Sequence, residues 1–572
     1  MKPSAAVYLA ALATALSLPF AAIPPLIATP WLSLTDDKLM LLILVVAWLW
    51  LGRDALPTRG EWRVLLPTLV FLVVTVVSAA LGPADYASEA LRYIARLVAC
   101  AFALLVAVRI GNVRALLWAV AIGGGLSGLL GIGEALHVAA LQPVLALFKV
   151  APTRVGGELR VSASFQYATI ASMYFEMVAP LAIVLAATSR RFGLQLLGAV
   201  IAAVCTANVV MSLTRAGMLT LLAVYGVLMA AAIVRHNRRR VLLPSLTGTA
   251  ALIAGGMLLF VHDQVFDLRL VSESDADWYG AVYQAPASLT VQPNQPVTVD
   301  LDVRNEGRIT WTSSENHPFA LGYRWLTDDG DGVLDIPPSE VQLGRDVQPG
   351  ETIHLQAALQ VPDLPAGSYR LDWGMLQRDV LQFYERGWAD AETRVVVQGS
   401  TSGSLPRVTP RDDGEAPWVV GRLDLWSAAV RLFAAHPLLG VGPDNFRHFY
   451  GAELGLEVWD ERVQANNLYL ELLADLGVLG VAAFAWLVLD PLYRLRHLVR
   501  SENVVTAERF DDRVSTDAVN YPVGRIVRVG VALAIGAFLL HGLLDSFLAF
   551  TPTALLFWML LGVAQKPQVS GR

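Results

Sequence analysis

Cysteine and charge are both scarce in this sequence, and each scarcity narrows the class of protein. Only two cysteines, Cys100 and Cys205, occur among 572 residues, and both lie inside apolar runs. A disulfide framework or a thiolate metal site is therefore not expected. Charged residues make up 16% of the chain and hydrophobic residues 55%. A soluble domain carries more charge and less apolar content, so this balance indicates a membrane protein.

Long apolar segments recur along the chain, each able to cross ~30 Å of hydrocarbon. Lys2 is followed by such a segment without a typical cleavage site, so we interpret it as a retained first helix. We predict about twelve transmembrane helices, near 5–34, 38–52, 62–81, 89–109, 114–137, 167–188, 192–211, 215–234, 242–261, 467–490, 524–548 and 551–566.

Basic clusters follow every second predicted span. They are Arg53, Arg59 and Arg63, then Arg109 and Arg114, then Arg190 and Arg191, then "RHNRRR" and "YRLRHLVR". Because loops rich in Lys and Arg stay in the cytoplasm, both termini are predicted to be cytoplasmic. The protein is then a multi-pass protein of the bacterial inner membrane, with residues 262–466 extracytoplasmic.

The long extracytoplasmic segment is polar and contains runs such as "VTVDLDV" and "TIHLQAALQV". Their period of two, broken by turns, predicts an antiparallel β-sandwich of Ig-like size. The acidic "TDDGDGVLD" is interpreted as a turn, with a calcium loop as the alternative although the spacing does not match an EF-hand. The predicted parts are a transmembrane bundle at 1–262, a linker at 263–284, the Ig-like β-sandwich at 285–398, a linker at 399–420, an external helical hairpin at 421–466, and transmembrane helices at 467–572.

Several arginines fall on the predicted outer side of the membrane. Arg215 lies in "SLTRAG" at an external turn, where it either snorkels from a helix end or faces a phosphate. Arg92 and Arg96 lie in the outer half of the fourth span, where pairing with Glu89 is the alternative to ligand binding. Arg160 lies on the loop before the sixth span. This collection of cations suits an anionic, membrane-embedded substrate that faces outward.

Two further stretches are expected beside these arginines. The first, "GRLDLWSAAVRLFAAHPLLGVGPDNF", predicts a helix that ends at His436, then a turn and a helix capped by Asp444 or Asn445. His436 is there a packing or capping residue, or a catalyst. In the second, "QANNLYLELLADLGVLG", Asn467, Glu471 and Asp475 recur at intervals of four residues. They form a polar helix face that lines an outward cavity, unless Asn467 caps the helix and Glu471 pairs with a loop arginine.

Together these pieces resemble the O-antigen ligase family. The resemblance rests on "SLTRAG", the "GRLDLW" helix with "HPLLGVGPDNF", "NNLYLELLADLGVLG", and "HGLLDSFLAFTPTALLFWMLLG", in that order. It implies a GT-C-like helical fold and transfer of a glycan from undecaprenyl diphosphate to an acceptor at the outer leaflet. The acceptor is a lipid, polysaccharide or protein; polymerisation is the alternative reaction. Membrane lipids are the other expected partners, and no cofactor, metal or nucleic acid is expected.

The resemblance also assigns roles to individual residues. It implies that Arg215 and Arg422 hold the diphosphate. The further substrate-binding residues are predicted from their places in the sequence rather than from the family, and they are Arg92, Arg96, Arg160, His436 and Asn467. The sequence departs from the family at Asn466, where the ligases commonly carry the histidine favoured as general base. Asparagine orients a hydroxyl but cannot take its proton.

That departure leaves three possibilities: a different acceptor, another base, or a degenerate site. Candidate bases are His436, His448, Asp475 and His541, which the sequence does not rank. The competing function classes are a secondary transporter or flippase, and a non-catalytic glycan-binding or assembly protein.

Overall fold

A computed structural model describes residues 5–22, 27–28, 33–34, 36–51, 59–150, 152–234, 248, 252, 255–256, 264–272, 275, 277–314, 317–399, 405–411, 420–501, 525–548 and 550–565. Most of the predicted span 242–261 and of the predicted linker 399–420 lies outside these residues. The chain forms two compact units. One comprises residues 1–153, 160–259 and 422–572, and the other comprises 154–159 and 260–421.

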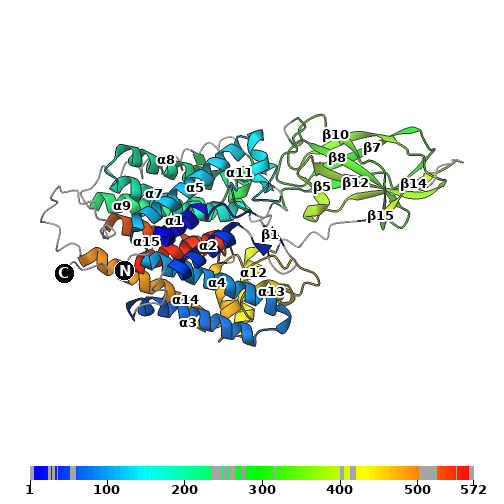
Figure 1. Cartoon of the computed structure of the whole chain (residues 1–572). Helices are drawn as coiled ribbons and strands as arrows, with labels where there is room; N and C mark the ends of the chain where they lie inside the picture. Colours follow the sequence, from blue (N-terminus) through cyan, green and yellow to red (C-terminus); the bar gives the residue numbers. More distant parts are fainter. Residues whose placement is uncertain are drawn as a thin grey trace. The chain divides into compact units, whose positions relative to one another are not determined.

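The first unit is helical (Figure 1). Its helices are α1 (Ala5–Ser17), α2 (Asp36–Leu51), α3 (Arg59–Leu81), α4 (Ala87–Arg109), α5 (Val113–Ala135), α6 (Gln142–Leu145), α7 (Ala168–Thr188), α8 (Phe192–Met211), α9 (Arg215–Val234), α12 (Arg422–Ala435), α13 (Phe446–Leu454), α14 (Leu468–Ser501), α15 (Arg525–His541) and α16 (Thr551–Gln565). Short 3₁₀ turns, η1 (Ala84–Tyr86) and η2 (Ala139–Leu141), lie between them.

Six helical segments in the described part are long and apolar enough to cross a membrane. They are Glu61–Leu81, Ala84–Arg109, Val113–Ala135, Ala168–Thr188, Phe192–Met211 and Leu468–Leu495. Shorter apolar helices are Ala5–Ser17, Arg215–Ala230, Ile526–His541 and Thr551–Gln565. A mostly helical membrane protein is thereby confirmed, while the count of twelve crossings stays a prediction.

Polar contacts between helix ends show which helix ends lie together at each end of the bundle. At one end, Arg109 at the end of α4 donates to both carboxylate oxygens of Glu61, at 2.9 and 3.0 Å. Arg114 at the start of α5 donates to Ser189 beyond α7, at 2.8 Å. At the other end, the Leu468 N–H that begins α14 donates to the carbonyl of Gly542 beyond α15, at 2.8 Å. The pairs α3–α4, α5–α7 and α14–α15 are therefore antiparallel, and the candidate site lies at this second end.

Helix α14 is broken near its start, and the loop between α12 and α13 fills the break. Gly477 has φ 64° and ψ −167°, which interrupts the helical hydrogen bonds. The Val478 N–H donates to the Pro437 carbonyl at 2.9 Å, and the Val441 N–H donates to the Ala474 carbonyl at 2.9 Å. Backbone groups released by the break are thus satisfied by the loop, as buried polar groups in a membrane helix must be.

Two glycines make this close approach possible. A Cβ on Gly477 would lie 2.4 Å from the Leu438 carbonyl carbon, and one on Gly440 would lie 2.2 Å from that of Asp475. Both glycines also have positive φ, of 64° and 68°, which side-chain-bearing residues rarely adopt. The "HPLLG" and "ADLG" stretches of the family motifs therefore form one packed unit.

The cap of α13 differs from the prediction. Asn445 is the residue before the first turn of α13, and its side chain accepts no hydrogen bond from the backbone N–H groups of that turn. Instead, Asp475 accepts the Phe446 N–H through Oδ1 at 2.8 Å and the Asp444 N–H through Oδ2 at 2.9 Å. A carboxylate from α14 replaces the local cap because the loop already lies against the broken helix.

The second unit contains the β-sheet region (Figure 1). An 8-stranded sheet has the path β15-β9-β8-β12-β14-β6, with β10 beside β8 and β13 beside β12, and a 3-stranded sheet has the order β11-β7-β5. The strands are β5 (Ala281–Gln284), β6 (Ser288–Val291), β7 (Pro296–Asn305), β8 (Phe319–Thr327), β9 (Gly332–Leu334), β10 (Ser339–Gln342), β11 (Thr352–Gln360), β12 (Gly367–Gln377), β13 (Leu381–Gln382), β14 (Ala391–Val397) and β15 (Val408–Pro410).

The predicted period of two is present in these strands. In β7, Val299, Leu301 and Val303 are buried and alternate with more exposed residues, and β11 repeats the pattern. The unit also contains helix α11 (Gln264–Val271), turn η3 (Phe383–Arg386) and a hairpin of β3 (Arg154–Val155) and β4 (Glu158–Leu159). Strands β1 (Ile27–Ala28) and β2 (Ser33–Leu34) pair in the helical unit. A β-sheet region is confirmed, while its Ig-like identity stays a prediction.

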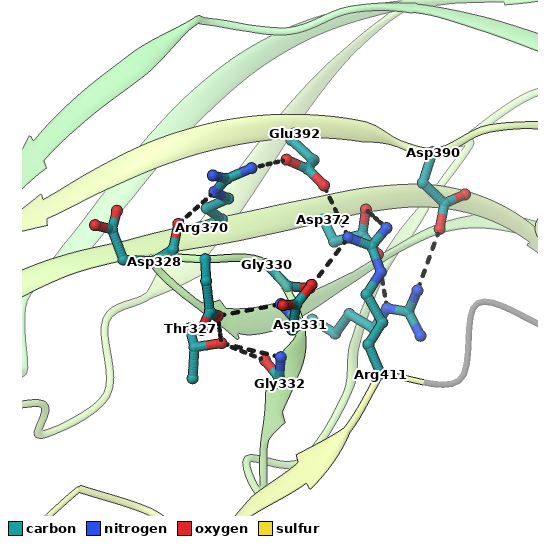
Figure 2. A network of polar contacts seen from close by, with 12 residues as sticks. Thr327, Asp328, Gly330, Asp331, Gly332, Arg370, Asp372, Asp390, Glu392 and Arg411 are labelled. Carbon is teal, nitrogen blue, oxygen red and sulfur yellow. Dashed lines mark hydrogen bonds and ion pairs between the residues drawn. The ribbon is translucent and has the colours of Figure 1, made fainter.

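The acidic turn after β8 belongs to a network of polar contacts (Figure 2). Asp329 accepts hydrogen bonds from the Thr327 hydroxyl and from the Asp331 N–H, the latter at 3.1 Å. Glu392 pairs at 2.8 Å with both Arg370 and Arg411. Among the described residues, no group of three or more His, Cys, Asp or Glu side chains is placed to hold a metal ion. The contacts of Asp329 are those of a turn, so the calcium alternative gains no support.

Candidate functional site

A fully buried ion pair joins α7 to α15. Glu176 lies inside the apolar helix α7, and its carboxylate is 0% exposed. His541 ends α15, is 1% exposed, and places Nδ1 3.0 and 2.9 Å from the two carboxylate oxygens. The Ser172 hydroxyl donates to Glu176 Oε1 at 2.7 Å. An ionised carboxylate only accepts hydrogen bonds, so the contact requires the imidazole proton at Nδ1.

The "TRAG" stretch lies directly against this pair. A Cβ on Gly217 would lie 2.1 Å from Ser172 Oγ and 2.5 Å from Glu176 Oε1, so only glycine fits there. Thr214 Oγ1 accepts a hydrogen bond from Arg160 Nη2 at 3.3 Å, and the Ser212 carbonyl accepts one from Arg160 Nε at 3.0 Å. The turn between α8 and α9 therefore brings the loop before α7 close to the buried pair.

A second buried pair holds the segment that carries Arg160. Lys149 Nζ donates to Glu134 Oε1 at 2.6 Å and to Ser162 Oγ at 2.7 Å. The other oxygen of Glu134 accepts the Ala163 N–H at 2.8 Å. Burial lowers the pKa of Lys149, and the neighbouring Glu134 charge opposes that shift. Because the pair binds the backbone on the C-terminal side of Arg160, it restrains the guanidinium at the "TRAG" turn.

The loop His541–Ser546 carries a carboxylate, Asp545, that lies near several positively charged side chains. Asp545 is half-buried, and its backbone carbonyl accepts the Leu468 N–H at 3.1 Å. Burial raises the pKa of Asp545, and the positive charges of His541, Arg422 and Arg160 oppose the rise. Arg160 and Arg422, two of the predicted arginines, are thereby within electrostatic range of one carboxylate.

The start of α14 closes the other side of this loop. Asn467 Oδ1 accepts the N–H groups of Tyr469 and Leu470, at 3.0 and 3.1 Å, so it is the helix cap that the sequence left open. Its Nδ2 donates to the Leu543 carbonyl at 2.8 Å. Glu471 accepts the Ser546 hydroxyl at 2.9 Å and the Ala465 N–H at 3.2 Å, in place of the loop arginine that was the alternative.

Asn466 lies between these contacts in a left-handed conformation, with φ 49°. It is half-buried, and within the described part of the chain its side chain makes no hydrogen bond to protein. Asparagine and histidine both tolerate this backbone region better than most residues. The backbone at residue 466 therefore suits the family histidine as well as the asparagine that is present.

Arg92 and Arg96 lie with a different set of residues. Arg92 is 70% exposed and pairs with Glu89 at 3.4 Å, which is the structural alternative predicted from the sequence. Glu89 also contacts Arg447 and accepts from His448 Nε2 at 2.8 Å. Arg96 is close to Asp444, where burial raises the pKa and the charges of Arg447 and Arg96 oppose the rise. These arginines gather around Glu89 and Asp444 rather than around Asp545.

His436 and Arg215 lie at the ends of two different helices. His436 is exposed just beyond α12, and its imidazole makes no polar contact among the described residues. Arg215 is half-buried as the first residue of α9, next to Thr214 in the chain. The structure thus gathers Arg160, Arg422 and Asn467 with the loop His541–Ser546, and leaves His436 apart from it.

Sequence reasoning did not single out Glu176 or Asp545. Glu176 is the one carboxylate within the predicted span 167–188, and ionisable residues inside a membrane usually face the bundle interior and serve a function. That signal was available from the sequence. The proximity of Asp545 to Arg160 and Arg422 was not, because it arises from three segments that are distant in sequence.

The fold first defines the class: a mostly helical integral membrane protein with an inserted β-sheet region. Residues 380–485 match the family model described as O-Antigen ligase, a range that includes α12, α13 and the break in α14. The match supports an O-antigen ligase family assignment for the chain, which confirms the resemblance carried by its motifs. That family suggests an O-antigen ligase-like or polymerase-like function, and its members use lipid-linked glycans and polysaccharide acceptors.

Other comparisons add little. No curated protein matches the sequence. Among solved structures, the alkylpurine DNA glycosylase AlkC of Pseudomonas fluorescens, bound to DNA containing an abasic site analog, is 10% identical. The alignment covers 68% of this chain and 97% of that chain, with a TM-score of 0.14. So low a TM-score carries no argument about fold or function.

Proposed function

We propose that this chain transfers a glycan from an undecaprenyl-diphosphate carrier to an acceptor at the outer leaflet of the bacterial inner membrane. The acceptor is a lipid, polysaccharide or protein, and polymerisation is the case in which it is another glycan chain. In this proposal the helical unit is a GT-C-like bundle of about twelve spans, both termini are cytoplasmic, and residues 262–466 are extracytoplasmic. The β-sheet region is an Ig-like spacer that is inserted in the sequence between two groups of membrane helices.

One observation carries the proposal: Arg422 and Arg160 are within electrostatic range of the Asp545 carboxylate, and Arg160 also donates to Thr214 of the "TRAG" turn at 3.3 Å, in a chain with O-antigen ligase motifs. Guanidinium groups present several donors in a fixed plane that matches phosphate oxygens. Positioned cations stabilise the negative charge that develops on a leaving diphosphate. Arg422, Arg160 and Arg215 are the residues proposed for that role.

The remaining predicted residues take supporting roles in this proposal. Asn466 orients the acceptor hydroxyl, because its amide is half-buried and not engaged by described protein groups. Asn467 holds the start of α14 against the loop Leu543–Asp545. Arg92, Arg96 and His436 contact the carrier lipid or the glycan farther from the reacting bond.

The test compares two arginines of the same helix. Full-length protein in lipid nanodiscs receives an undecaprenyl-diphosphate-linked oligosaccharide and a polysaccharide acceptor, and product formation is followed by mass spectrometry. Arg422→Ala should lower turnover about 100-fold or more, as removal of a group that stabilises developing charge does. Arg431→Ala is the matched control, since Arg431 is exposed on α12 and, among the described residues, donates only to the Glu453 carbonyl at 2.8 Å.

Arg215→Ala is measured in parallel. Equal turnover in wild type, Arg422→Ala and Arg215→Ala would remove both arginines from the reaction. Substrate movement that depends on an ion gradient, without any new glycosidic bond, would favour the transporter class instead.

A further inference from the structure

We propose that Asp545 takes the proton from the acceptor hydroxyl, and that His541 and Glu176 are positioning residues behind it. This inference rests on the proposed glycan transfer. It assigns a general base to a chain in which residue 466 cannot accept a proton, because a neutral amide is not basic at useful pH.

The four bases suggested by the sequence fit this role less well than Asp545. Asp475 uses both carboxylate oxygens to accept backbone N–H groups. His448 lies between Glu89 and Glu461, at 2.8 and 3.1 Å, and stacks on Tyr86, away from the loop His541–Ser546. His436 is exposed and makes no polar contact in the described chain.

His541 is itself too enclosed to meet an acceptor. Its side chain is 1% exposed, its Nδ1 is occupied by Glu176, and its ring packs edge-on against Phe547 at 5.0 Å. Asp545 lies four residues farther along the chain, beyond the end of α15, and is half-buried. A base must reach the proton that it removes, so accessibility favours the carboxylate.

Asp545 also has an oxygen available for that proton. Oδ1 accepts the Ser546 N–H at 2.9 Å, whereas Oδ2 has no hydrogen bond to any described residue. The backbone is fixed because the Asp545 carbonyl accepts the Leu468 N–H at 3.1 Å. The carboxylate is therefore held in place by its main chain while one oxygen remains open to a hydroxyl.

The step balances without any further reactant. The acceptor oxygen forms a bond to the anomeric carbon as its proton moves to Asp545 Oδ2. The bond from that carbon to the diphosphate oxygen breaks, and its electron pair leaves with the diphosphate. Arg422 and Arg160 stabilise the charge that departs, and Asp545 then releases the proton to water.

Charged groups near Asp545 affect the pKa of its carboxyl. They come from His541 on α15, Arg422 at the start of α12 and Arg160 before α7, and the titratable group of Glu471 on α14 also lies within electrostatic range. Burial raises the pKa of the Asp545 carboxyl above its ordinary value, and a carboxylate with a raised pKa is a stronger base. Glu176 fixes the imidazole through Nδ1, so His541 keeps a constant orientation beside the loop.

The experiment measures kcat and KM across pH 5.5–9 for the full chain in nanodiscs, with the same donor and acceptor as above. Asp545→Asn should lower kcat at least 100-fold while KM for the donor changes less than about threefold. Asp545→Glu should recover part of the activity, and the pH at which kcat falls on the acidic side of the profile should shift. His541→Gln should lower kcat about tenfold and should also shift the pH at which kcat falls on the acidic side. Asp460→Asn is the control carboxylate, outside the loop His541–Ser546, and should behave as wild type.

The outcomes separate this inference from the function on which it rests. An inactive wild type would refute the proposed transfer. Active wild type together with an Asp545→Asn variant that retains turnover would overturn the inference alone. A loss in Asp545→Asn that appears in donor KM and thermal stability, with no recovery in Asp545→Glu, would also overturn it, because that pattern describes a structural residue.

Discussion

The imidazole of His541 and the carboxylate of Glu176 meet at 2.9 Å in a fully buried ion pair, although 365 residues separate them in sequence. The pair joins α15 to α7 where the "TRAG" turn passes. A buried pair loses its solvation on both sides, and removal of one partner leaves an uncompensated charge. A change that disturbs this contact, or the segments packed on it, should therefore lower the free energy of unfolding.

Gly217→Ala is expected to disturb this contact. The new methyl group would lie 2.1 Å from Ser172 Oγ and 2.5 Å from Glu176 Oε1, so the first turn of α9 must move away. We expect a loss of about 1–3 kcal/mol in unfolding free energy, the usual cost of an overpacked site. Thermal unfolding in nanodiscs, with transfer activity measured in parallel, provides the check.

Gly226→Ala is the matched control on the same helix. A Cβ there meets no atom within 4 Å, so the helix should become slightly more stable through the better propensity of alanine. Equal stability of the two variants would mean that the "TRAG" glycine does not pack against Glu176 as described.

Asp475→Ala should loosen the loop between α12 and α13. The Asp444 and Phe446 N–H groups donate to the Asp475 carboxylate, at 2.9 and 2.8 Å, and to no other acceptor among the described residues. Each buried N–H left unsatisfied costs about 1–3 kcal/mol. Hydrogen exchange of peptides that cover 440–450 should become faster, and Asp475→Asn should have a smaller effect because it keeps one acceptor oxygen.

Asp424→Ala serves as the control for that measurement, since Asp424 is exposed in the first turn of α12. Unchanged protection of the loop in Asp475→Ala would contradict the proposed bridge between the broken helix and α13.

Much of the fold could be predicted from local sequence. Apolar runs placed α3, α4, α7 and α8 within a few residues, because burial in lipid demands a run of that length. Strands β7 and β11 follow from period-two alternation. The break in α14 could not be predicted in this way, because Gly477 is held by Leu438, a residue from a different helix connection.

The candidate site was predicted only in part. Arg160 and Arg422 were predicted as substrate-binding or catalytic residues, and the charges of both affect the pKa of Asp545. Arg92 and Arg96 gather around Glu89 and Asp444 instead, since the rotation of α4 about its axis decides which neighbours its arginines meet. Spacing along one helix says nothing about that rotation relative to other helices.

Substitutions at residue 466 should separate backbone strain from chemistry. With φ at 49°, Asn466→Gly and Asn466→His should change unfolding free energy by less than about 1 kcal/mol, because both residues enter the left-handed region readily. Asn466→Val should cost about 1–2 kcal/mol, since a β-branched side chain is strained there. Thermal unfolding of the three variants in nanodiscs measures the difference.

Activity of the same variants addresses the departure from the family. If Asp545 is the base, Asn466→His should raise turnover by no more than a few fold, whereas a merely degenerate site should gain activity that is absent in wild type. Equal unfolding temperatures for Asn466→His and Asn466→Val would contradict the left-handed backbone at this residue.

The β-sheet region should have its own pH dependence. Burial, followed by the charge of Asp372, raises the pKa of Asp390 from its ordinary 3.8 to about 7, against the charges of Arg324 and Arg411. The folded state therefore binds this proton more tightly than the unfolded chain. Stability from Asp390 is fully present below the ordinary pKa and is lost as pH rises toward about 7.

Asp390→Asn should remove that loss, because an amide does not ionise. Hydrogen exchange of β12 and β14 peptides in the full chain, corrected for the intrinsic effect of pH, should show wild-type protection falling between pH 5 and 8 and a flatter curve for the variant. Asp363→Asn is the control, since Asp363 is exposed and its carboxylate accepts, within the described part of the chain, a single hydrogen bond, from Asn294 at 3.2 Å. Parallel curves for wild type and Asp390→Asn would show that Asp390 is ionised throughout this range, with Arg324 and Arg411 outweighing the effects of its burial and of Asp372.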